Sequence, residues 1–284
     1  MLRLTFKLPR SSQAKYLQRT LSIQRKQESK RISLKRTLKV PTEKLIEEPY
    51  ASVLTYPKLR NAELEKRLRE LQKLGVSALE FGGEKQVSNL PVLGKGCVGI
   101  VTIAYVSGRK TALKIRRVDA DRSRMEHEAE MLEKANSVSV GPRLLKASKN
   151  FLLMEFVDGE LLPKWLEKKE TKAQVRRVIR DILQQCWRLD VIGLDHGELS
   201  HAPKHIIIDK DGNPFIVDFE TASVNRRPSN VTSICQFLFM SGVAEKLADK
   251  IGERDKKVIL EALKRYKGCR NQANFERVLK SCGL

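Results

Sequence analysis

The sequence His196-Gly197-Glu198-Leu199 is followed, twenty residues beyond its glutamate (218 − 198), by Asp218-Phe219-Glu220. Upstream of both lie the glycine-rich stretch Gly94-Lys95-Gly96-Cys97-Val98-Gly99 and the triplet Ala112-Leu113-Lys114. Each element is common by itself, but the four together in this order are not. They offer a pliant loop, one ammonium group and several carboxylates, which is the set that a nucleoside triphosphate and its metal ion require.

The glycine-rich stretch lies between two predicted strands, 90–93 and 100–106, and not between a strand and a helix. This position excludes a dinucleotide-binding fingerprint, which must open a helix. Between strands, Gly94, Gly96 and Gly99 would let the backbone lie over the phosphates of a nucleotide. A plain glycine-rich hairpin is the alternative, and the lysine that follows favours the nucleotide.

Lys114 lies in the apolar strand segment 111–115, where an ammonium group needs an anionic partner. Phosphate oxygens and a carboxylate from the next helix would meet that need. Three glutamates of the predicted helix 122–135 compete for this role: Glu126, Glu128 and Glu130. We expect Glu128, because Leu132 one turn later completes the face that packs on the sheet. Alternatively, Lys114 is a surface lysine and the glutamates are ordinary helix charges.

The segment Met154–Val157 ends the last predicted strand before a break at Asp158-Gly159. The backbone carbonyl of Glu155 and the amide of Val157 could hydrogen-bond the edge of an adenine ring. Two apolar side chains would cover that ring as a lid, those of Val101 and Ala112.

The two acidic motifs suggest different roles. A carboxylate on a loop can accept the proton of a substrate hydroxyl or hold that hydroxyl in place. Glu198 is the preferred candidate because His196 stands two residues before it, and Asp195 is its rival. Asp218 follows a strand end, where it would bridge Mg²⁺ to the phosphates. Glu220 is either a second metal-binding carboxylate or a solvated side chain.

Charge is unevenly distributed along the 284 residues, whose formal net charge is +21. Residues 1–45 hold 13 Lys and Arg against two Glu, so 13 − 2 = +11 lies in this segment alone. Such a field favours polyanions, above all RNA or a ribosomal precursor, through phosphate contacts and counterion release. A solubilising tail and, less favoured, an organelle transit peptide are the alternatives.

Cysteine usage and hydropathy indicate a cytoplasmic protein. The five cysteines are scattered without a CxxC pair, which argues against a zinc ribbon or a disulfide framework and fits a reducing compartment. No uninterrupted apolar run approaches the roughly 18–20 residues of a membrane helix, so we expect no membrane contact.

Four regions are expected along the chain: a basic, disordered arm at 1–50, an N-terminal helical extension at 51–87, an N-terminal lobe at 88–157 and a reduced C-terminal lobe at 158–284. The N-terminal lobe should hold one helix and five antiparallel strands, at 90–93, 100–106, 111–115, 143–147 and 151–157. The C-terminal lobe should be mainly helical, with two short strands at 206–209 and 214–217. The predicted fold is therefore α+β and bilobal.

From about residue 60 to 284, the chain resembles the eukaryotic-type protein kinase fold, and within it the atypical RIO-like lineage, in particular the small predicted serine/threonine kinases of archaea. The resemblance rests on the stretches 93–101, 112–121, 196–200 and 217–220. It implies transfer of the γ-phosphate of ATP, with Mg²⁺ or Mn²⁺, to a Ser or Thr hydroxyl on a protein or on the chain itself. It also implies catalytic roles for Lys114, Glu128 and Glu198, and a metal-binding role for Asp218.

Departures from the kinase pattern carry information. A kinase catalytic loop has Asp, and Asn five residues later, whereas this chain has Glu198 and Pro203 at that spacing. The metal-ligand position falls instead on His205, seven residues on (205 − 198). Imidazole suits Mn²⁺ better than Mg²⁺, so we expect better activity with Mn²⁺. Alternatively, His205 only packs at a strand start.

Other functions remain open. The segment 221–229 is too short for a peptide-docking platform, although Arg226-Arg227 within it could contact an anion. An ATP-binding switch that acts on RNA or the ribosome, a small-molecule phosphotransferase and a pseudokinase are the alternatives to a protein kinase.

Overall fold

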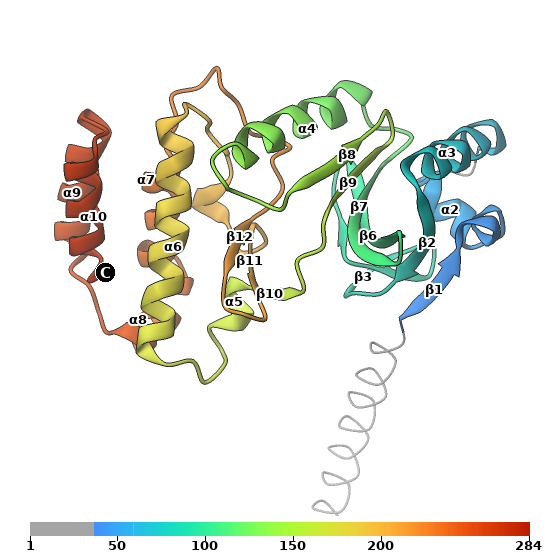
Figure 1. Ribbon diagram of the computed structural model, residues 1–284. Coiled ribbons are helices and arrows are strands. Elements are labelled where there is room, and N and C mark those ends of the chain that lie inside the picture. The colour runs from blue at the N-terminus through green and yellow to red at the C-terminus, as the bar shows by residue number, and fades with distance from the viewer. Residues whose placement is uncertain (1–36, 59) are drawn as a thin grey trace, which may run out of the picture.

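A computed structural model describes residues 37–58 and 60–284. It shows two lobes, a β-rich one and a helical one, joined by the chain between β9 (Phe151–Glu155) and β10 (Gly159–Leu161) (Figure 1). The bilobal α+β fold predicted from the sequence is confirmed. Most of the expected basic arm, residues 1–36, lies outside the described residues.

The sheet of the N-terminal lobe is larger than predicted. Its described strands are all antiparallel and number seven, not five, in the order β1-β2-β6-β7-β9-β8 with β5 paired to β6. Their bounds are β1 Leu38–Pro41, β2 Val76–Phe81, β5 Gly94–Lys95, β6 Gly99–Val106, β7 Arg109–Arg116, β8 Leu144–Ala147 and β9 Phe151–Glu155. The predicted strand 90–93 is mostly β4 (Leu90–Val92), which pairs with β3 (Lys85–Val87) in a separate hairpin.

Two of these strands correct the expected domain boundaries. β1 lies in the region assigned to the arm, and β2 in the region assigned to the helical extension. Because β2 pairs with both β1 and β6, the N-terminal lobe begins at about residue 38 and not at 88.

The helical part of the chain before β2 covers one face of this sheet. It consists of a 3-10 turn (Thr42–Ile46), α2 (Tyr50–Leu54) and α3 (Asn61–Leu74), which ends where Gly75 adopts a left-handed φ of 81°. Arg67 of α3 is fully buried and donates hydrogen bonds to the carbonyls of Leu54 and Arg116 and to the side chain of Asn150. These bonds lock α3 to the end of β7.

Strands β6 and β7 form the hairpin that carries the predicted lysine. Both residues of its turn, Ser107 and Gly108, have positive φ (49° and 76°), as in two-residue turns whose twist suits a hairpin. Leu113 and Ile115 of β7 pack in the core beneath α3. Because side chains alternate along a strand, Lys114 points to the opposite face.

α4 (Arg122–Asn136) lies on that opposite face, with the side chain of Asp121 capping its first turn. Its buried residues Met125, Met131 and Leu132 belong to the same hydrophobic cluster as the C-terminal lobe. The helix therefore bridges the two lobes (Figure 1).

The C-terminal lobe is built around α6 (Lys172–Val191), which starts with a capping box formed by Thr171 and Gln174. A three-stranded sheet of β10, β11 (Ile206–Asp209) and β12 (Pro214–Ile216) faces the other lobe. The remaining helices are α5 Leu162–Trp165, α7 Asn230–Met240, α8 Val243–Ile251, α9 Lys256–Gly268 and α10 Gln272–Ser281, with a 3-10 turn at Leu199–His201. None of the helices in the described part of the chain has the length and apolar character needed to cross a lipid bilayer.

Candidate active site

A buried ion pair joins the sheet to α4. The Nζ of Lys114 lies 2.6 Å from Oε2 of Glu128, and both side chains are almost wholly buried. Of the other two glutamates on α4 that compete for this role, Glu126 is exposed and Glu130 pairs with Lys134. Glu128 is thus the helix carboxylate that reaches the strand lysine.

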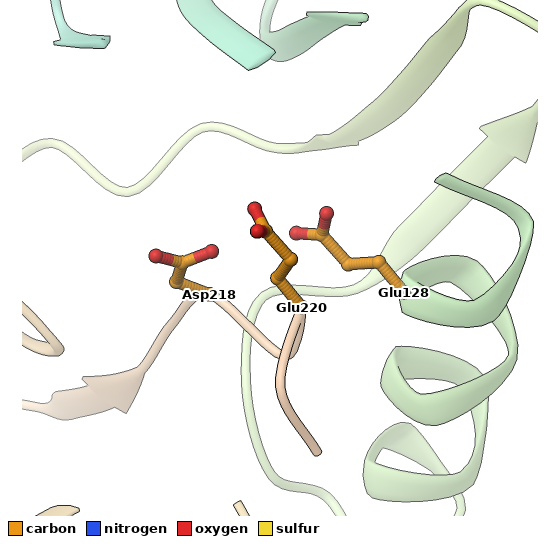
Figure 2. Close-up of side chains that lie close together, drawn as sticks. All are labelled: Glu128, Asp218 and Glu220. Carbon is orange, nitrogen blue, oxygen red and sulfur yellow. The ribbon is translucent and has the colours of Figure 1, made fainter. Parts of the chain in front are cut away.

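Two carboxylates from the C-terminal lobe converge on the same ammonium group. Oδ1 of Asp218 lies 3.2 Å and Oε2 of Glu220 lies 3.3 Å from Nζ of Lys114. Figure 2 shows Glu128 on its helix and the other two carboxylates, from the segment after β12, pointing into one space. Four residues from three separate parts of the chain therefore meet at one point between the lobes.

The backbone after β12 sorts these side chains. Asp218 adopts a left-handed φ of 70°, which is uncommon for a residue other than glycine. The next side chain, Phe219, is buried in the core of the C-terminal lobe, while Asp218 and Glu220 face Lys114. Such a costly conformation persists where the surroundings impose it, and it is typical of functional sites.

Burial and mutual attraction act against each other in this cluster. Burial alone would lower the pKa of Lys114, but Glu128 and Asp218 outweigh burial and raise that pKa above its usual range. For Asp218 burial would raise the pKa, yet attraction to Lys114 lowers it. Burial raises the pKa of Glu128 in spite of its lysine partner.

The acidic cluster suits a divalent cation. Oxygen atoms of Glu128, Asp218 and Glu220 lie within 4.8 Å of one another. With all three ionised, one ammonium and three carboxylates sum to 1 − 3 = −2, a charge that a divalent cation would neutralise. Carboxylate oxygens are the donors that Mg²⁺ and Mn²⁺ accept. The residues present therefore fit a divalent metal ion, with Asp218 and Glu220 the more exposed members.

Glu198 and His205 form the other side of the site. Nε2 of His205 lies 2.8 Å from Oε2 of Glu198, and its Nδ1 lies 4.0 Å from Oδ2 of Asp218. The imidazole is buried, whereas Glu198 is about a third exposed and also approaches Lys204 at 3.8 Å. His205 thus stands between the carboxylate expected to orient a hydroxyl and the carboxylate expected to bind the metal.

His196 supports this arrangement from behind. Its ring is fully buried, its Nε2 lies 3.1 Å from the carbonyl oxygen of Val217, and it packs edge-on against His205 and Phe219. Burial lowers the pKa of His196 to about 4, so the ring is neutral near pH 7. The neutral imidazole, hydrogen-bonded to the carbonyl oxygen of Val217, holds in place the residue that precedes Asp218.

Asp195, the rival of Glu198, has a structural place. Its carboxylate accepts hydrogen bonds from Nε of Arg226 at 3.0 Å and from the amide of Ser229 at 3.0 Å, and its backbone pairs with Ser223. Arg227 donates to the carbonyl of Lys267. The suggestion that Arg226-Arg227 contacts an anion is therefore not supported, because both guanidinium groups are engaged within the chain.

The glycine-rich stretch lies over the lysine strand. A Cβ atom on Gly99 would come within 3.0 Å of Cγ of Lys114 and of the carbonyl oxygen of Ile115. The nearest atoms to such a Cβ would be at 3.7 Å for Gly96 and 3.5 Å for Gly94, which is ordinary contact. Only Gly99, of these three, is required by close packing; the other two leave space over the site.

The predicted adenine-binding residues lie where the lobes join. Ala112 is half-buried and pairs in register with Met154, next to Glu155. The amide of Glu155 donates to the carbonyl of Arg143 at 2.9 Å. The amide of Val157 makes no hydrogen bond to another residue of the described chain and remains available to a ligand.

A hollow of about 180 Å³ adjoins this segment, lined by Glu155, Val157 and the turn between β11 and β12 at 209–211, among others.

The sequence gives His196 no role beyond marking the motif, and it does not decide between the two possibilities for Glu220. For His196 the sequence gives no clear signal, because Asp195 and Glu198 lie close to it in the chain and only the fold buries its ring. For Glu220 no local signal exists, because the direction of its side chain depends on the turn at Asp218.

Comparisons with known proteins agree with this geometry. A sequence model of the RIO domain matches residues 103–234, a stretch that contains Lys114, Glu128, Glu198 and Asp218. Over 117 residues the chain is 32% identical to Uncharacterized protein MJ1211 of Methanocaldococcus jannaschii. That match covers 40% of this chain and 98% of the archaeal protein.

Proposed function

Because the chain belongs to the RIO domain family of atypical protein kinases, we propose that it binds ATP with a divalent metal ion beside Lys114 and transfers the γ-phosphate to a Ser or Thr hydroxyl, on another protein or on itself. The observation that carries this proposal is the convergence of three carboxylates from both lobes within 3.3 Å of one buried ammonium group.

Each group of residues in the site would contact a different part of the bound nucleotide. Lys114, held by Glu128, would contact phosphate oxygens of ATP, and Gly99 keeps the loop close above it. Asp218, with His205 beside it, would hold the metal ion, which supplies positive charge to the phosphates when bound. Glu155 and Val157 would offer backbone groups to the adenine ring.

Glu198 would act on the acceptor. Its carboxylate would take the proton of the Ser or Thr hydroxyl as that oxygen bonds to the γ-phosphorus and the bond to ADP breaks. Glu198 is one methylene longer than the aspartate usual at this position. Although Glu198 contacts His205, its side chain is still partly exposed. An acceptor hydroxyl could therefore reach its carboxylate.

A transfer assay tests the proposal. Purified protein is incubated with [γ-³²P]ATP and Mg²⁺ or Mn²⁺, with itself and with generic protein substrates as acceptors. We expect label transfer by the wild type and its loss in Asp218→Asn and Glu198→Gln, with circular dichroism spectra unchanged. Transfer that survives both substitutions would refute the assignment, and nucleotide binding without any transfer would identify a pseudokinase.

A second candidate function, binding to RNA, is favoured by the basic face of α9. α9 carries five Lys and Arg against one Glu (5 − 1 = +4), and these basic residues are exposed. We propose that this face contacts phosphates of RNA, so that affinity falls steeply with salt. Electrophoretic mobility shifts at low and moderate salt test it, and the absence of binding at low salt would exclude it.

A further inference from the structure

A basic hollow lies in the N-terminal lobe, apart from the Lys114 cluster. It has a volume of about 370 Å³ and lies between the start of α3, the end of β7 and the start of α4. Its lining contains four cationic side chains, those of Arg60, Lys66, Arg116 and Arg122. It contains one carboxylate, that of Glu63. Small-molecule sites commonly have volumes of about 300–1,000 Å³, so the hollow is large enough for a ligand.

The one carboxylate is already neutralised. Oε1 of Glu63 lies 3.1 Å from Nε of the buried Arg67 and 3.6 Å from Nη2 of Arg116. For the other three cations, Arg60, Lys66 and Arg122, no ion pair or side-chain hydrogen bond to any of the residues 37–58 and 60–284 is found. The lining therefore has an excess of positive charge, with four cations and one carboxylate.

Arg116 makes this excess costly. Its guanidinium group is almost fully buried and bonds mainly to neutral acceptors: the side chain of Asn150 and the carbonyls of Arg117 and Ala120. Burial, and then the neighbouring Arg122, lower the pKa of Arg116, and the nearby carboxylates of Glu63, Glu70 and Asp121 only partly oppose this. An anion in the hollow would relieve this repulsion and gain charge-assisted hydrogen bonds from Arg and Lys.

We propose that this hollow binds a phosphate group in its dianionic form, either free or carried by a phosphorylated Ser or Thr side chain. Several guanidinium and ammonium donors around one small cavity suit the three oxygens of such a group, and Arg clusters are a common way to recognise it. A chloride ion would use few of these donors.

Occupancy would restrain the elements that hold the Lys114–Glu128 pair. Arg116 stands two residues beyond Lys114 on β7, and Arg122 stands six residues before Glu128 on α4 (128 − 122). A phosphate bonded to both arginines would tie the start of α4 to the end of β7.

Amide chemical shifts of the full chain test the proposal without ATP. Inorganic phosphate and a phosphoserine peptide are titrated separately at about pH 7.5, above the second phosphate pKa of about 6. We expect shifts at Ala62, Val118 and Ala120, which also line the hollow. Similar affinity for both ligands would indicate free phosphate as the ligand, and tighter binding of the peptide would indicate a phosphorylated protein segment.

Matched double variants provide the control. Lys66→Ala with Arg122→Ala removes two lining cations, whereas Lys73→Ala with Arg124→Ala removes the same charge from exposed positions on the same helices outside the hollow. We expect the first pair to weaken binding by at least about tenfold, as loss of charged hydrogen bonds implies, and the second pair to leave it within about twofold. Equal losses, shifts centred elsewhere, or tighter binding of a short RNA at these residues would overturn the proposal.

Discussion

The Nζ atom of Lys114 on β7 and the Oε2 atom of Glu128 on α4 lie 2.6 Å apart, and less than a tenth of either side chain is exposed. Neither charge would be stable in this position alone, because a buried charge without a partner is costly. The pair therefore couples the sheet of one lobe to the helix that packs against the other.

The first prediction concerns this pair. Glu128→Gln keeps the shape of the side chain but leaves Lys114 with only the two carboxylates of the C-terminal lobe. We expect the free energy of unfolding, from urea titrations, to fall by about 1–3 kcal/mol. Glu126→Gln, on the exposed side of the same helix, should change it by less than about 0.5 kcal/mol. Equal effects of the two substitutions would show that the ion pair does not stabilise the fold.

The second prediction separates two glycines of one loop. Gly99→Ala places a methyl group 3.0 Å from Lys114 and from the backbone of Ile115, so we expect a loss of about 1–3 kcal/mol in unfolding free energy and weaker ATP binding. Gly96→Ala meets only the carbonyl oxygen of Gly99, at 3.7 Å, and should be tolerated. Thermal unfolding of both variants measures this difference in stability. A Gly99→Ala protein as stable as the wild type would mean that the loop is not closely packed on the strand.

The third prediction concerns pH. The pKa of His196 is about 4 in the folded chain because of burial, whereas an unfolded histidine has a pKa of about 6.5. Between these values the unfolded chain binds a proton that the native chain does not, so stability falls as the pH falls. One such proton contributes at most about 1.4 kcal/mol per pH unit. Above pH 7 its contribution is constant.

Urea titrations at several pH values between about 7 and 4 measure this slope. His196→Asn removes the titrating group, so the variant should lose part of the pH dependence although it starts from lower stability. An unchanged slope in the variant would show that His196 is not the group responsible.

Much of the fold was predictable because the helices and the β6–β7 hairpin have strong local signals. The stripe of leucines and Gly75 defined α3, and the Ser107-Gly108 turn defined the hairpin. β2 was missed because it is buried on nearly its whole length, so its side chains do not alternate between apolar and polar. β1 is a four-residue edge strand within a basic segment, and only pairing with β2 reveals it.

Those residues of the candidate site that lie in recognisable sequence motifs could be predicted. A side chain whose orientation depends on a backbone turn could not. Lys114, Glu128 and Asp218 meet as their motifs suggested. The two possibilities for Glu220 could not be separated in advance, because the left-handed backbone at Asp218 is what turns Glu220 toward Lys114. Asp195 could be distinguished from Glu198 only by its bonds to Arg226 and Ser229.

The fourth prediction concerns the choice of metal ion. Nδ1 of His205 lies 4.0 Å from Oδ2 of Asp218, and His205 occupies the position at which kinases have the side-chain amide of an Asn. Imidazole is a better ligand for Mn²⁺ than for Mg²⁺. We expect higher phosphotransfer with Mn²⁺ than with Mg²⁺, and a shift of that preference toward Mg²⁺ in His205→Asn. Metal titrations of both proteins test this. Equal or better wild-type activity with Mg²⁺ would exclude His205 as a ligand.

The most direct test of the central claim is a calorimetric titration of the full chain with ATP, with and without Mg²⁺ or Mn²⁺. We expect binding that depends on the metal ion and is lost, by at least about tenfold in affinity, in both Lys114→Met and Asp218→Asn, as removal of charged contacts implies. Asp249→Asn, at an exposed position of α8 away from the site, is the control and should bind like the wild type. ATP affinity that is indifferent to the metal ion and to Lys114 and Asp218 would contradict the account.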